Sequence, residues 1–167
     1  MLAAFFYVAY FGKSIHSYIW TKLLIDEDVI DRVETVVEGS RLIIRVKPTL
    51  KGLWNWDNAD KVTARITLPE PEAITVNGSG DLKGEGRFKT GNMSVSVNGS
   101  GSAALEMESG NVDLSVSGSG EISVKGRMKD LESSVSGSGQ IYVVAESSGA
   151  FSGDVSGSGK INIQGKA

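Results

Sequence analysis

A five-residue segment, Val-Asn-Gly-Ser-Gly or Val-Ser-Gly-Ser-Gly, occurs five times between residues 76 and 159. The first glycines of these segments are Gly78, Gly99, Gly118, Gly137 and Gly157. They are separated by 21, 19, 19 and 20 residues. A period near 20 residues is typical of a solenoid, in which each repeat forms one coil that stacks on the coil before it. This regular spacing constrains the fold more tightly than the composition does.

Apolar and polar residues alternate around each first glycine. The residue two positions before it is always valine: Val76, Val97, Val116, Val135 and Val155. The position six before it holds Glu72, Met93, Val112, Leu131 and Phe151, and the positions four and six after it are also mostly apolar. Odd offsets are mostly polar. Strict alternation predicts strands with one buried and one solvated face.

The alternation keeps its phase through the Gly-Ser-Gly segment. Both glycines therefore fall on inward-facing positions, and the serine between them faces outward. A glycine at such a position lets the backbone turn a corner or approach a neighbouring coil closely. We expect the coil to turn at this segment.

A column of charged residues supports one repeat per coil. The position nine after the first glycine holds Arg87, Glu108, Arg127 and Glu146. If the coils stack in parallel, about 4.8 Å apart, these side chains form a column of alternating sign. The pattern predicts a parallel β-solenoid. An antiparallel β-sandwich is the alternative, and it does not require columns that match at a fixed period.

The chain before the repeat also has strand-like segments. Residues 41–46 and 61–68 have strand composition, whereas residues 26–39 fit either a short helix or a strand. The apolar stretch 2–11 is interrupted by Lys13 and His16 before it could span a bilayer. We expect a buried strand or an atypical or misassigned start there, with a signal or anchor segment as the alternative. Residues 1–22 are accordingly set apart from a single domain at 23–167, with clear repeats from 73 to 167.

Trp54 and Trp56 lie one residue apart in the loop 51–60. One interpretation is a hydrophobic plug over an open coil, which a solenoid needs for solubility. The other is a platform for a glycan or a protein partner, because exposed tryptophan can stack on a ligand. These two residues are the candidate binding site in the sequence.

The composition excludes several kinds of chemistry. The 167 residues include no cysteine and one histidine, so disulfides, thiolate metal sites and histidine clusters cannot form. We expect the single histidine, His16, to be structural and not part of a Ser-His triad. The net charge of −3 gives no electrostatic footprint for nucleic acid. Neither GxGxxG nor GK[ST] occurs. We therefore expect no catalytic residue, no metal and no cofactor.

Two carboxylates require separate consideration, because some β-helices cleave polysaccharides. Asp81 and Glu121 share the column three residues after the first glycine and lie two coils apart, about 9–10 Å by strand spacing. That separation is close to the one in inverting glycosidases. Ser102 lies between them, however, and solvated surface charge is the simpler interpretation.

The sequence resembles a known family in the stretch "LPEPEAITVNGSGDLKGEG" (68–86) and in the repeated "VSGSGEISVKG" unit (116–126). These residues are similar to the head GIN domain family of auto-transporter adhesins, and "DEDVIDRVETVVEGSRLIIRVKP" (26–48) is similar to the segment upstream of its repeats. The resemblance covers 23–167 and implies a right-handed parallel β-helix, exported to the periplasm or the cell surface. It carries no catalytic residues over to this chain.

Three functional hypotheses follow. The first is a non-enzymatic, exported adhesive or structural module at the periplasm, outer membrane or cell surface, with a surface glycan or a protein as partner. The second is a protein on the same fold that binds or cleaves polysaccharides. The third is a scaffold that self-associates through the last coil, residues 160–167, whose edge could pair with another chain.

Overall fold

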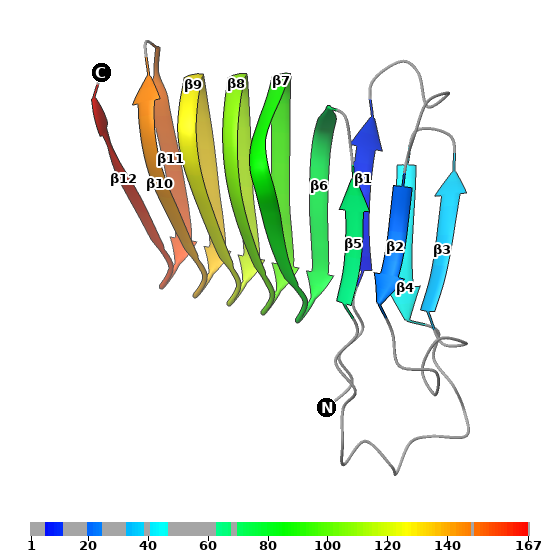
Figure 1. Cartoon of the computed structure of the whole chain (residues 1–167). Coiled ribbons are helices and arrows are strands. Elements are labelled where there is room, and N and C mark those ends of the chain that lie inside the picture. Colours follow the sequence, from blue (N-terminus) through cyan, green and yellow to red (C-terminus); the bar gives the residue numbers. More distant parts are fainter. Residues whose placement is uncertain are drawn as a thin grey trace.

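The computed structural model describes residues 6–11, 20–24, 33–38, 41–46, 63–67, 70–147 and 149–166 (Figure 1). All secondary structure in these ranges is β-strand, apart from the bends and turns between strands. Across these ranges, no helix has the length and apolar character to cross a membrane. The molecule is therefore all-β wherever the structure describes it.

The repeat folds as a stack of parallel coils, visible as the row of arrows from β6 to β12 in Figure 1. Its strands are β6 (Pro71–Gly78), β7 (Asp81–Gly99), β8 (Ser102–Gly118), β9 (Glu121–Gly137), β10 (Gln140–Ser147), β11 (Phe151–Gly157) and β12 (Lys160–Lys166). Strands β7, β8 and β9 have 17–19 residues each. Each therefore extends through nearly a whole repeat, and the Gly-Ser-Gly segment separates it from the next strand.

The register confirms the columns that the sequence predicts. Val76 pairs with Val97, Val97 with Val116, Val116 with Val135, and Val135 with Val155. The first glycines pair in the same order, from Gly78 to Gly157. All these pairings are parallel, so one repeat is one coil of a β-solenoid and the antiparallel sandwich is wrong.

Strands before the repeat extend the same sheet in the antiparallel sense. They are β1 (Phe6–Phe11), β3 (Val33–Glu38) and β4 (Arg41–Val46), and β1 lies between β6 and β4. A separate antiparallel pair joins β2 (Trp20–Leu24) to β5 (Thr63–Thr67). The segment that fitted either a helix or a strand thus forms a strand from Val33 to Glu38.

Strand β1 has a specific place in this arrangement. It pairs with β6 from Phe6 to Phe11 and covers the outer edge of the first coil. One interpretation of the sequence was that Trp54 and Trp56 cover an open coil, but both residues lie outside the described part of the chain. The structure therefore provides one cover for this edge and leaves the tryptophan hypotheses untested.

Stacked aliphatic side chains fill the interior of the solenoid. Val76 and Val97 are fully buried, and Val116 and Val135 are 2% exposed. The column of Ile122 and Val124 on β9 and of Ile141 and Val143 on β10 is buried as well. Val155 is different: it is 42% exposed, so the expectation of a core valine in every coil is wrong for the last one. No further coil lies above β11 among the described residues to cover it.

Another interior column becomes smaller toward the C-terminal end. Val95 pairs with Leu114, Leu114 with Ser133, and Ser133 with Gly153. Val95 and Leu114 are fully buried. Ser133 is 1% exposed, and its hydroxyl has no hydrogen-bond partner within the described part of the chain. The interior therefore loses apolar volume from β8 to β11.

The two glycines of each Gly-Ser-Gly segment have different roles. The second glycine faces inward as predicted: a Cβ on Gly120 would lie 2.5 Å from Cγ1 of Val97. The first glycine does not face the interior. Gly99 has φ of 124°, and a Cβ there would lie 2.4 Å from the carbonyl oxygen of Gly78 in the coil below. The prediction that both glycines face inward is thus wrong for the first one.

Backbone hydrogen bonds join the stacked turns directly. The amide of Ser100 donates to the carbonyl oxygen of Gly78 at 2.9 Å, and that of Ser119 donates to Gly99 at 2.9 Å. Ser138 and Ser158 repeat the bond to Gly118 and Gly137. A side chain at the first glycine would lie in this contact, which explains why only glycine occupies the position.

The first repeat is longer than the others because of an irregularity in β7. Lys83 pairs with Ala104, but the next pair is Arg87 with Glu106, so Gly84, Glu85 and Gly86 stand opposite a single residue. Gly86 has φ of 89°, which a glycine adopts without strain. A bulge of this kind absorbs extra residues without changing the register beyond it. It accounts for the spacing of 21 residues.

We predict that Gly120→Ala destabilises the solenoid by about 1–3 kcal/mol, because the added methyl group overpacks the interior against Val97. Urea unfolding followed by circular dichroism measures this change. Gly91→Ala is the matched control, since a Cβ there meets no atom within 4 Å and its φ is not positive. The control should be neutral or slightly stabilising, and equal destabilisation of both variants would contradict the assignment.

Candidate functional site

One flat outer surface of the solenoid presents uncharged polar side chains in register. We call this surface the serine face and define it by two columns, three residues and one residue before the first glycine. The columns are Thr75, Ser96, Ser115 and Ser134, and Asn77, Asn98, Ser117 and Ser136. Neither column carries a charge across these four coils.

Hydrogen bonds between neighbouring coils organise part of the serine face. The hydroxyls of Ser96 and Ser115 lie 2.9 Å apart, and Asn98 Nδ2 donates to Asn77 Oδ1 at 3.0 Å. Ser117 and Ser136 are exposed and continue the asparagine column. The result is a regular array of hydroxyl and amide groups with the strand spacing of a parallel sheet, about 4.8 Å.

An open hollow of about 520 Å³ borders the serine face. Its lining includes four carboxylate residues, Glu72, Asp113, Asp130 and Glu132, together with Asn92, Asn111 and apolar side chains. Asp113 and Glu132 are directly opposite in register on β8 and β9. Like charges in that arrangement repel each other. The hollow therefore has an acidic lining that the parallel register imposes.

Two residues of this lining have positions that the sequence does not reveal. Glu72, like Met93, lies six residues before a first glycine, so the alternation of the repeat predicts that it faces inward. In the structure it is exposed and lines the hollow, so that prediction is wrong. Asp130 has a structural contact, because its Oδ1 accepts a hydrogen bond from the Ala150 amide at 3.0 Å. Only part of the acidic lining is thus available to a ligand.

Ion pairs connect the coils on another part of the surface. Arg127 Nε lies 2.9 Å from Glu146 Oε2, and Lys89 Nζ lies 3.5 Å from Glu108 Oε2. Glu108 also stands opposite Arg127 in register. The column Lys89, Glu108, Arg127 and Glu146 therefore alternates in sign through four strands, and we call it the charge ladder.

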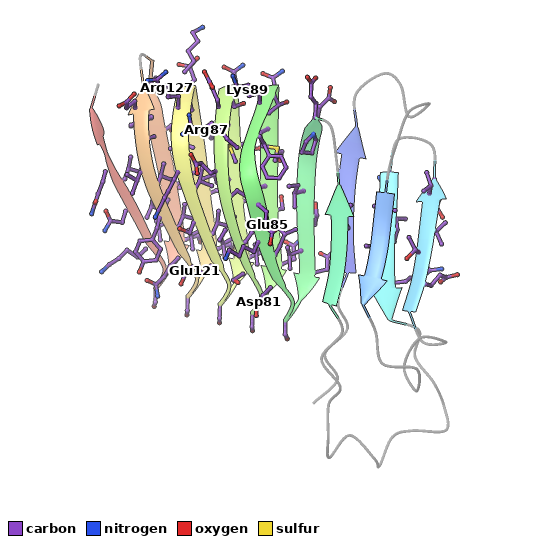
Figure 2. All side chains as sticks on the ribbon, viewed as in Figure 1. Asp81, Glu85, Arg87, Lys89, Glu121 and Arg127 are labelled. Atoms are coloured by element: carbon purple, nitrogen blue, oxygen red, sulfur yellow. The ribbon has the colours of Figure 1, made fainter. Side chains whose placement is uncertain are left out.

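The predicted charge column was correct from Glu108 to Glu146 and wrong at Arg87. The bulge in β7 moves Arg87 two positions, so it pairs with Glu106 at 2.5 Å and Lys89 takes its predicted place (Figure 2). The hydrogen bond from Arg87 to Glu106 raises the pKa of the guanidinium above its usual value. The alternation survives because a second basic residue follows Arg87 at the right distance.

The two carboxylates considered for glycoside cleavage lie where the sequence places them. Asp81 pairs with Ser102, and Ser102 pairs with Glu121, so the carboxylates are two coils apart on one surface (Figure 2). Ser102 Oγ donates a hydrogen bond to Asp81 Oδ1 at 2.7 Å. The hydroxyl of Ser102 therefore binds Asp81 within the row that separates the two carboxylates.

The candidate binding residues Trp54 and Trp56 lie outside the described part of the chain, so their role stays a prediction. The acidic hollow was not found from the sequence. The sequence did contain a signal for it: Asp113 and Glu132 each lie five residues before a first glycine, so they stand in the same column on successive coils. Among the described residues, no group of three or more histidine, cysteine or acidic side chains has an arrangement that could hold a metal ion.

We predict that Arg127→Glu destabilises the solenoid by about 1–2 kcal/mol at low salt, since it places three acidic side chains on successive strands of the charge ladder. Arg127→Gln should cost less, because it removes attraction without adding repulsion. Thermal unfolding at low and high salt separates the two effects. We expect the two variants to have similar stability at high salt, because salt screens the repulsion. A stability difference of the same size at low and high salt would contradict an electrostatic cause.

Comparison with known proteins identifies the family of this chain. A family model described as "Putative auto-transporter adhesin, head GIN domain" matches residues 21–167. No curated protein and no solved structure was found to match the chain. The match extends from the second described strand through the last coil. The chain belongs to the auto-transporter adhesin head GIN domain family.

Proposed function

We propose that this protein is a non-enzymatic, adhesin-like module that is exported and acts in the periplasm or at the cell surface. The observation that carries the proposal is the family match, which extends over residues 21–167. The solenoid suits such a role, because a stack of coils forms an extended surface for contact with a partner. The proposal concerns adhesion, and it assigns no chemical step to the chain.

The serine face is the part of the solenoid best suited to contact a partner. Its hydroxyl and amide groups both donate and accept hydrogen bonds, as the hydroxyls and amides of a neutral glycan or a protein surface do. Ser117 and Ser136 are exposed on neighbouring coils. A charged column would favour ionic partners, whereas this uncharged surface favours neutral polar ones. We infer that the partner is a surface glycan or a polar protein surface.

Cleavage of a polysaccharide has less support than adhesion. The Asp81 and Glu121 carboxylates are separated by Ser102, which hydrogen bonds to Asp81. An inverting pair needs free space between its two carboxylates for the attacking water. Because Ser102 stands between the two carboxylates and binds one of them, we propose that the contact with glycans is binding alone.

The location is tested on cells that produce the native full-length protein. We expect protease added to intact or osmotically shocked cells to digest the protein, because an exported module is accessible after the outer barrier is opened. A cytosolic marker protein should resist the same treatment. Recovery of the native protein only in the cytosolic fraction would contradict export.

Binding is tested with arginine substitutions on the serine face. We predict that the double variant Ser117→Arg and Ser136→Arg loses at least about tenfold in affinity for a partner found on a glycan or protein array, because two bulky cations then stand on a neutral surface. Ser123→Arg is the matched control, since Ser123 lies on β9 outside the serine face, between Ala104 and Tyr142 in register. Equal loss in the control would contradict binding through the serine face.

A further inference from the structure

The C-terminal end of the solenoid leaves two strand edges and an apolar surface open. β11 pairs with β9 and β12 pairs with β10, and no described strand pairs with the other edge of either one (Figure 1). Phe151 is 38% exposed and Val155 is 42% exposed, and Ile161 and Ile163 are only partly buried. Unpaired backbone groups beside apolar side chains form a ready template for another strand.

We propose that a second copy of this chain covers this end, related by a two-fold axis that runs along the strands. Such an axis inverts the direction of stacking and exchanges the two surfaces of the coil. It therefore places β11 of one copy antiparallel to β12 of the other, and the reverse. Both open edges of both copies are paired in a single isologous interface.

The register of this interface follows from superposing the turns of the two copies. The turn at Ser158 lies between β11 and β12, so residues at equal distances from it stand opposite each other. Val155 then lies over Ile161 of the partner subunit, and Gly153 lies over Ile163 of the partner subunit. Phe151 lies over Gly165 of the partner subunit. Inward positions meet inward positions, and two of the three pairs combine a glycine with a large side chain.

The outward positions of the same register are complementary in charge. Asp154 stands opposite Asn162 of the partner subunit, and Lys160 of the partner subunit is its diagonal neighbour. Diagonal pairs on neighbouring strands are within reach of long side chains. The two-fold axis produces this acid–base contact twice. Both residues are exposed in the single chain.

The other possible two-fold arrangement is disfavoured by the same residues. An axis perpendicular to the flat surfaces would place β11 against β11 of the partner, and a centred register would put Asp154 opposite its own copy. Like charges directly opposite are destabilising. Gly153 would also meet Val155 of the partner subunit in place of a larger side chain. Charge and size therefore select the arrangement in which β11 pairs with β12.

The proposal is tested by exchanging the two charges. We expect the unchanged chain to form a dimer in sedimentation equilibrium at micromolar concentration and low salt. Asp154→Lys and Lys160→Glu, each alone, should raise the dissociation constant about tenfold or more, since each places like charges at both diagonal contacts. The double variant should return to within about threefold of the unchanged chain, because the pairs form again with reversed sign.

Matched controls make the outcome specific to this interface. Asp113→Lys carries the same change of charge on an outward position of β8, away from the open end, and should leave the dimer unchanged. Asp154→Asn weakens the proposed dimer, whereas it would strengthen one in which Asp154 faces its own copy. A monomer at all concentrations, failure of the double variant to recover, or tighter association of Asp154→Asn would each overturn the proposal.

Discussion

The structure depends on the close approach of backbone to backbone at each Gly-Ser-Gly turn. The serine amide of one turn bonds to the carbonyl oxygen of the first glycine below it, and no side chain fits between them. This contact fixes the register of the turns, and the parallel strands on both sides must then follow it. The valine columns, the hydrogen-bonded asparagines and the charge ladder are all consequences of that register. A change in the register at one turn would misalign every column above it.

The sequence predicted the solenoid well because its signal is repeated. One amphipathic strand has many interpretations, but five aligned segments with valine at the same place permit few. The errors occur where a residue's environment is set by something other than the repeat. Val155 obeys the pattern, yet nothing in the described structure lies above it. The alignment also could not separate the two glycines, because backbone dihedral angles are not visible in the alternation of polar and apolar residues.

The surface features were harder to predict than the core for a physical reason. The inward positions must all satisfy one requirement, burial, and so they share one residue class. The outward positions satisfy no common requirement, and the serine face, the acidic hollow and the charge ladder therefore differ in chemistry although they lie on the same coils. The column of Asp113 and Glu132 shows this, since repulsion within it is tolerated at the surface. Arg87 adds a second reason, because a bulge of two residues changes its partner without any change in the repeat motif.

The tapering interior column has a consequence for how the molecule opens. Along this column, Val95 and Leu114 have aliphatic side chains, Ser133 has only a hydroxymethyl group, and Gly153 has no side chain. Local opening is easiest where few apolar contacts are lost. The last coil should therefore fray before the central ones, and amide hydrogens of β11 should exchange faster than those of β8. In the monomer, the solenoid then has a gradient of local stability along its axis, lowest at the last coil, whereas pairing with a second copy would protect that coil.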